Sequence, residues 1–200
     1  ASGGVMIVAL LLTMICCIVL GMGVPTTATY CIMAATCAPI LMSPEIGVEM
    51  LAAHFFVFYF GIVADITPPV ALAAYAGAAI AKAGPMKTAF NASRLAIAAF
   101  IVPYIIAMNP AMLFINTTIP EVVMITISSI IGIFGVAAGL SGFVFRNMKC
   151  WERLLCIVGG LTLLVPGSLT DLIGLVLVGA VCVLGYQAAK KEKEKEMLAA

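Results

Sequence analysis

The chain has 200 residues and a net charge of +1, and 64% of its residues are hydrophobic while only 10% are charged. Soluble globular domains have about 45–50% apolar and about 25% charged residues, so the composition excludes a soluble domain, and the net charge indicates neither an acidic nor a basic partner. Uncharged stretches such as 1–44, 95–120 and 122–145 reach or exceed the about 20 residues that cross a bilayer. They predict an all-α polytopic membrane protein.

Residues 1–43 are expected to form a re-entrant helical hairpin. Val5–Leu20 and Ala28–Ser43 are apolar and helical in character, and two glycines and a proline interrupt them within 21–27. Glycine and proline both remove helix propensity. No charged residue accompanies this break, so the turn need not reach water. Non-helical backbone survives at membrane depth only inside protein or beside a wet cavity, so the hairpin tip is a candidate site.

Residues 44–81 are expected to form a discontinuous transmembrane helix. Ile46–Ala64 is helical in character, Asp65–Pro69 interrupts the helix, and Val70–Ala81 resumes it. The first proline disfavours the α conformation at the residue before it, and the second is suited to the first turn of a new helix. Transporters place such half-helices near the membrane midplane to bind ions and anionic groups.

The remainder is predicted to contain a polar cytoplasmic connector, two transmembrane helices, a basic loop with a C-terminal hydrophobic hairpin, and a charged cytoplasmic tail, at 82–94, 95–145, 146–189 and 190–200. All ten basic residues lie in the connector, the basic loop and the tail. The positive-inside rule assigns such segments to the cytoplasm. We therefore expect a multi-pass protein of the cell inner membrane with a cytoplasmic C-terminus.

The two breaks together predict a cation site. Glycines free backbone carbonyls and threonines add hydroxyl oxygens, and hard cations need several oxygens at once. Sodium suits neutral oxygens without a carboxylate cluster. The candidate substrate- and ion-binding residues are Gly21, Gly23, Pro25, Thr26, Thr27, Asp65, Thr67, Pro68 and Pro69. Those expected to contact Na⁺ directly are Gly21, Gly23, Thr27 and Thr67.

Simpler interpretations exist for these features. The hairpin tip could be a plain kink, and Asp65 could cap the half-helix that begins at Pro69 or bond its own turn. We expect His54 to be a packing or hydrogen-bonded residue. The glycosylation sequons that begin at Asn91 and Asn116 are expected to be chance matches.

Nothing in the sequence indicates an enzyme. It holds no nucleophile–base set and no metal-spaced set, and the seven cysteines are expected to act as small buried hydrophobes. No cofactor is expected apart from Na⁺ as the coupling ion. An intramembrane enzyme is therefore the weakest of the function classes considered.

Four motifs resemble the large membrane subunit of tripartite ATP-independent periplasmic (TRAP) transporters: Gly21–Ala28, Phe56–Val70, Ala83–Phe90 and Ala107–Leu113. The chain is most similar to the type in which the small and large membrane subunits are fused and which works with a TAXI-type binding protein. A weaker motif, Val165–Gly174, resembles the tail of that fused type.

The resemblance implies an elevator-type, sodium-coupled permease that imports small organic anions (carboxylates) delivered by a periplasmic binding protein. Gly21–Thr27 would be the tip of the second hairpin and Asp65–Pro69 the second broken helix, with a sodium site between them. The partners would include an N-terminal remainder of the permease with the fused small subunit. Ala71 stands where the dicarboxylate branch commonly has glycine. The alternative from the residues is a non-transporting structural subunit of an energy-transducing complex.

Overall fold

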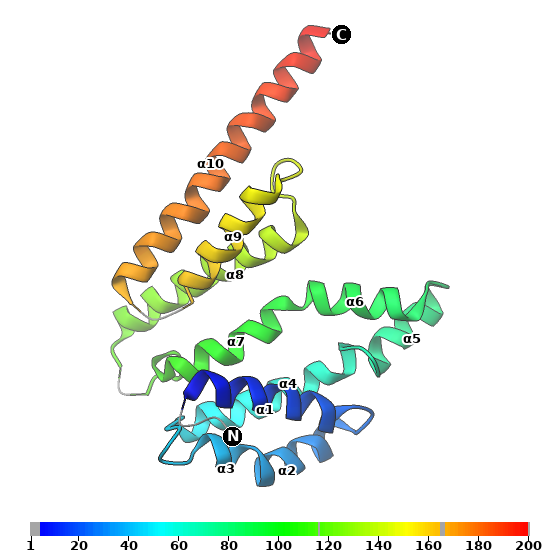
Figure 1. The fold of residues 1–200 in the computed structure, drawn as a ribbon, viewed down its shortest axis with the longest axis vertical. Coiled ribbons are helices and arrows are strands. Elements are labelled where there is room, and N and C mark those ends of the chain that lie inside the picture. The colour runs from blue at the N-terminus through cyan, green and yellow to red at the C-terminus, as the bar shows by residue number, and fades with distance from the viewer. Residues whose placement is uncertain (1–4, 116, 165–166, 200) are drawn as a thin grey trace. The chain divides into compact units, whose positions relative to one another are not determined.

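The computed structural model describes residues 5–115, 117–164 and 167–199. In this part of the chain the named secondary-structure elements are all helices (Figure 1). Asn116, where one sequon begins, and Val165 and Pro166, where the weaker tail motif begins, lie outside the described residues. The chain divides into two compact units, Ala1–Asn116 and Thr117–Ala200. The predicted all-α class is therefore correct.

The first unit is built around one central helix. Its elements are α1 (Met6–Gly21), α2 (Thr26–Thr36), α3 (Ala38–Leu41), α4 (Met50–Val63), η1 (Ala64–Ile66), α5 (Leu72–Ile80), α6 (Pro85–Leu95), α7 (Ile97–Met108) and η2 (Pro110–Leu113). Helices α1, α2 and α7 all pack against α4. Phe56 and Phe60 of α4 are fully buried, and each makes an edge-to-face contact with Tyr104 of α7. This aromatic core fixes the position of α4, at whose end the chain breaks.

The connector expected at 82–94 is largely helical. Helix α6 begins at Pro85, because proline at the first helical position loses no hydrogen bond and already has a helical φ. It is followed by α7 after a bend of 41°. Small side chains join α6 to α5: Ala71, Ala74 and Ala89 form a separate buried cluster.

The second unit contains α8 (Ile119–Ser141), α9 (Cys150–Thr162) and α10 (Ser168–Ala199). Glycines bring the helix backbones close together: a Cβ placed on Gly160 of α9 would lie 2.6 Å from the carbonyl oxygen of Gly132 on α8. Close approach through small residues is the usual packing mode of helices in membranes. The 13 residues of α9 span only about 20 Å at helical rise.

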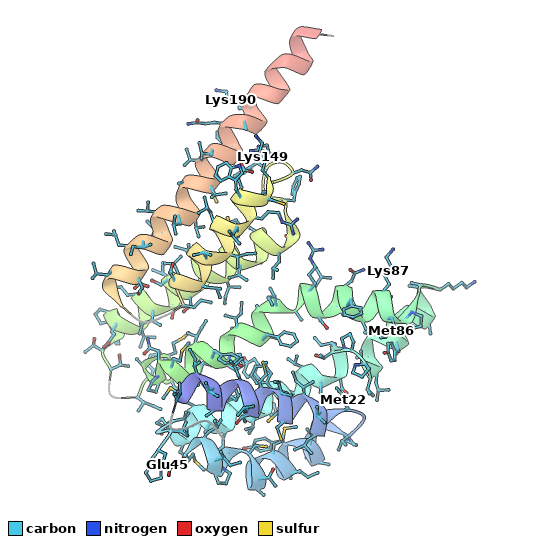
Figure 2. All side chains as sticks on the ribbon, in the orientation of Figure 1. Met22, Glu45, Met86, Lys87, Lys149 and Lys190 are labelled. Atoms are coloured by element: carbon cyan, nitrogen blue, oxygen red, sulfur yellow. The ribbon has the colours of Figure 1, made fainter. Side chains whose placement is uncertain are left out.

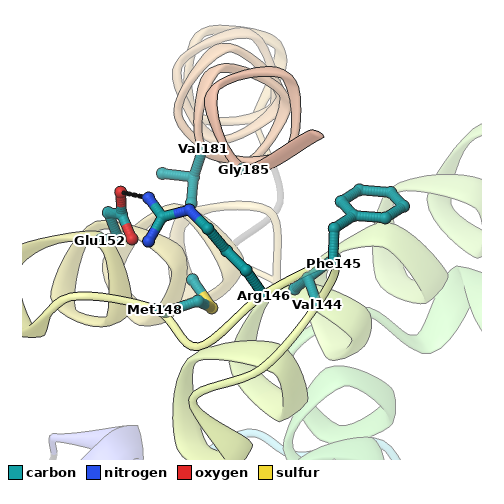
Figure 3. A pocket seen from close by; sticks show the side chains of 7 residues that line it. All are labelled: Val144, Phe145, Arg146, Met148, Glu152, Val181 and Gly185. Atoms are coloured by element: carbon teal, nitrogen blue, oxygen red, sulfur yellow. Dashed lines mark hydrogen bonds and ion pairs between the residues drawn. The ribbon is translucent and has the colours of Figure 1, made fainter. Parts of the chain in front are cut away.

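A small pocket lies where the loop between α8 and α9 meets α10 (Figure 3). Arg146 crosses it and forms an ion pair of 2.5 Å with Glu152 of α9. Arg153 donates hydrogen bonds to the carbonyls of Gly139 and Leu140 at the end of α8 (2.9 and 3.0 Å). A cationic group is favourable at a helix C-terminus, so the Arg153 contacts fix α9 to the end of α8. The ion pair of Arg146 fixes the loop to α9.

Two described helices are long and apolar enough to cross a membrane: Ile119–Ser141, and Leu169–Ala188 within α10. The bent pair α6–α7 is a third if it is counted as one span. Met6–Gly21 and Met50–Ile66 are shorter apolar helices. These two helices lie in the segments for which the sequence predicts the hairpin and the broken helix.

Candidate functional site

The hairpin turn and the break after α4 lie against each other. Gly21, the last residue of α1, is buried, and a Cβ placed on it would lie 2.9 Å from the Cβ of Ala64 and 3.0 Å from the carbonyl oxygen of Gly61. A Cβ on Gly23 would lie 4.0 Å from a methyl group of Val70. Met22, labelled in Figure 2, marks this turn. The structure therefore brings together the two segments from which the sequence predicted a site.

The hairpin turn is short and polar at its exit. Gly23 has a φ of +75°, a conformation that glycine adopts without strain. Pro25 is the residue before α2, and Thr26 and Thr27 are exposed in its first turn. The hydroxyl of Thr29, one turn further on, donates to the carbonyl of Val24 (3.3 Å). Helix α2 thus begins two residues earlier than the apolar pattern indicates, and both threonines belong to it.

The break after α4 begins with one 3₁₀ turn, η1, and passes into extended backbone. Thr67 has φ −102° and ψ 125°, as the following proline favours. Its hydroxyl donates to the carbonyl of Val63 (2.7 Å), which leaves the oxygen lone pairs available to accept. Pro68 is half-buried and Pro69 is exposed.

Asp65 is half-buried within η1. It does not cap the second half-helix, because α5 begins after Ala71 and receives no side-chain cap. The carboxylate therefore lies at the break without capping the second half-helix, one of the two simpler interpretations of this residue.

Comparison with known protein families shows which family the chain belongs to. Residues 1–122 match the family described as "Tripartite ATP-independent periplasmic transporter, DctM component". The chain belongs to this family. Neither the search of curated proteins nor that of solved structures gave a match.

The DctM match covers α1 to η2 and therefore contains both breaks. As a member of the DctM family, the chain belongs to the membrane permease component of TRAP transporters, which is a multi-pass membrane protein and not an enzyme. TRAP transporters move solutes with a periplasmic binding protein. The predicted family is correct at this level.

Two side chains that are not among the predicted site residues donate hydrogen bonds to backbone carbonyls in the break after α4. Ser93 of α6 donates to the carbonyl of Ile66 (2.8 Å), and the hydroxyl of Tyr75 of α5 donates to the carbonyl of Pro69. In the sequence, Ser93 is the last residue of the sequon that begins at Asn91. No sequence signal connects it to Ile66, because the two residues are 27 positions apart.

His54 of the DctM component is hydrogen-bonded, as predicted. Its Nδ1 lies 3.1 Å from the hydroxyl of Tyr30, which links α4 to α2. The ring of Tyr30 also contacts Phe58 edge to face. His54 therefore joins the hairpin to the broken helix by packing and one hydrogen bond.

Proposed function

We propose that this chain is part of an elevator-type, sodium-coupled permease that imports small organic anions (carboxylates). The observation that carries the proposal is the close approach of the hairpin turn to the break after α4, at Gly21 and Ala64. Two interrupted segments that meet inside one unit are the arrangement in which transporters bind ions and anionic substrates.

Sodium would be held by oxygen atoms from both sides of this contact. The hairpin offers the carbonyls of Gly21 and Gly23 and the hydroxyl of Thr27, and the break offers the hydroxyl of Thr67. Thr26 and Asp65 lie beside them in sequence and complete a set of about six oxygens, the number that a hard cation requires. The proposed site is neutral apart from Asp65, which suits a monovalent ion.

A substrate carboxylate would bind next to the ion at the start of α2. The first backbone N–H groups of a helix have no partner within the helix, and no side chain caps α2. Such a helix start favours an anion. Pro25 on the hairpin and Pro68 and Pro69 at the break would shape the walls around it.

The wider assembly follows from the same proposal. A TAXI-type binding protein would deliver the substrate, and an N-terminal remainder of the permease with a fused small subunit would supply the first hairpin and the scaffold. The placement of the basic residues supports an inner-membrane protein with a cytoplasmic C-terminus. We expect a purely structural membrane subunit to have unbroken helices. In this chain the helices are interrupted between α1 and α2 and between α4 and α5.

Removing one hydroxyl from each side tests the sodium site. Thr67→Val and Thr27→Val keep the side-chain shape, and each should raise the sodium concentration for half-maximal uptake. A lost ligand costs about 1–3 kcal/mol, which corresponds to a shift of roughly 5- to 150-fold. The measurement is substrate uptake into proteoliposomes that contain the complete permease, with its binding protein, at increasing sodium concentration.

Thr36→Val is the matched control. Thr36 also bonds the carbonyl one turn before it (to Ile32, 2.8 Å), but it lies at the far end of α2 from the turn. It should leave the sodium response unchanged. Asp65→Asn then tests whether the charge itself matters. If both site variants are well folded and respond to sodium as the unaltered permease does, the proposed site is wrong.

A further inference from the structure

The carbonyls ahead of the two prolines have lost their ordinary helical partners. In a continuous helix, the carbonyls of Ala64 and Asp65 would accept from the N–H groups of residues 68 and 69, but both residues are prolines and carry no N–H. The carbonyl of Ala64 instead accepts from the amide of Thr67 (3.2 Å). The two prolines therefore end the regular backbone pairing of α4, and side chains of other helices can orient carbonyls at the break.

One such contact comes from α6. The hydroxyl of Ser93 lies 2.8 Å from the carbonyl oxygen of Ile66 and 3.1 Å from that of Ala89, one turn back in its own helix. Ser93 could satisfy its single hydroxyl hydrogen within α6 alone. The shorter bond to Ile66 instead reaches from α6 to the break, at the point where the backbone becomes extended at Thr67 and the helix does not continue.

The position of Ser93 is fixed by packing. Ala89 is fully buried and belongs to the cluster that it forms with Ala71 and Ala74 of the segment after the break. Ser93 stands one turn beyond Ala89, so the α5–α6 contact sets the place of its hydroxyl. Tyr75 of α5 contacts the same cluster and bonds the carbonyl of Pro69. The break is thus held at both edges by side chains of α5 and α6.

We propose that Ser93 is a positioning residue for the ion site: by holding the Ile66 carbonyl it keeps the two neighbouring residues, Asp65 and Thr67, in the backbone conformation that directs their side-chain oxygens to the ion. Asp65 and Thr67 flank Ile66 in the chain, so a change in the backbone dihedral angles at Ile66 moves the two residues relative to each other. This inference rests on the sodium site proposed above. It adds a role for α6, a segment outside the two interrupted elements.

Ser93→Ala removes the hydroxyl without adding volume. It should raise the sodium concentration for half-maximal uptake by about 2- to 10-fold, the worth of one net hydrogen bond. Ser93→Thr keeps the hydroxyl and should restore the response. Thr88→Ala is the matched control, because Thr88 lies on the same helix and makes only a local bond to the carbonyl of Gly84 (3.0 Å).

A second measurement reports on the break without sodium transport. Amide hydrogen exchange of the complete permease should be faster over 64–71 in Ser93→Ala than in Thr88→Ala, because the amides of Thr67 and Ala71 are the ones bonded within the break. Tyr75→Phe, which keeps the ring and removes the hydroxyl, should act in the same direction.

The two readouts separate the possible failures. If Thr67→Val shifts the sodium response and Ser93→Ala matches Thr88→Ala in both measurements, Ser93 is not a positioning residue and the proposed function stands. Faster exchange in Ser93→Ala with an unshifted sodium response also overturns the inference, since the bond is then merely structural. If the unaltered permease does not respond to sodium, the proposed function fails, and with it the positioning role.

Discussion

Gly21 is a residue at which the hairpin and the broken helix are closely packed. It faces Ala64 and the backbone of Gly61, and Gly61 in turn lies close to Thr29 and Met33 of α2. Lipid tails are as apolar as the side chains, so helices in a membrane associate by close packing rather than by the hydrophobic effect, and small residues permit that approach. The pair of glycines thus sets the distance across the candidate site.

Gly21→Ala should destabilise the permease. The added Cβ would lie 2.9 Å from a side chain and 3.0 Å from a backbone oxygen, and overpacking of this kind costs about 1–3 kcal/mol. The thermal unfolding midpoint in detergent should fall, and uptake should fall with it.

Gly77→Ala is the control for helix propensity. Gly77 lies within α5, and apart from its chain neighbours and the adjacent backbone of its own helix, no described atom stands within 4 Å of its added Cβ. Alanine is favoured over glycine in a helix by about 1 kcal/mol, so this variant should unfold at the same temperature or a higher one. An equal fall in both variants would mean that the contact at Gly21 is not close-packed.

At the scale of the elements, the interruptions could be predicted from the sequence and the contacts that stabilise them could not. Glycines and prolines have local effects, so the expected end of the first helix at Leu20 lies next to the observed end at Gly21. Helix α6 was missed because Gly84 and Pro85 are typical of a loop, although proline also begins helices. The bond from Ser93 to Ile66 depends on tertiary packing, which local pattern does not encode.

The cysteines also show that burial and contacts depend on tertiary packing more than on local sequence. The sequence predicted small buried hydrophobes, and Cys17, Cys37 and Cys156 are buried, whereas Cys16, Cys31 and Cys150 are exposed. The sulfur atoms of Cys16 on α1 and Cys37 after α2 lie 3.9 Å apart. Two positions that are 21 residues apart in the chain thus meet where the hairpin arms pack together.

A mild oxidant such as copper phenanthroline should therefore join Cys16 to Cys37. The two thiols would lose two protons and two electrons to the oxidant and form one disulfide, which requires only a small movement of the sulfur atoms. Mass spectrometry of unreduced peptides from the permease detects the linked pair. Cys16→Ser should abolish this peptide and Cys31→Ser should retain it; an unlinked Cys37 in the unaltered protein would contradict the pairing of the arms.

At the scale of the whole molecule, the charge pattern extends further along the chain than the family match. The DctM match ends at residue 122, so it covers the first unit and only the start of α8. The basic residues continue beyond it: Arg146, Lys149 and Arg153 precede or begin α9, and a lysine-rich stretch begins at Lys190 on α10. Orientation can therefore be argued for both units from charge alone, without placing one unit against the other.

The orientation predicts which positions a membrane-impermeant thiol reagent reaches from each side. Single cysteines at Lys87 and Lys149, in a permease that is otherwise free of cysteine, should be labelled only from the cytoplasm, because loops that carry the basic residues stay inside. Cysteines at Glu45 and Glu121 should be labelled only from outside. All four side chains are exposed (Figure 2 labels three of them), so failure to label reports the side of the membrane. Labelling of Glu45 and Lys87 from the same side would show that the segment from α4 to α5 does not cross, and would overturn the broken-helix assignment with the orientation.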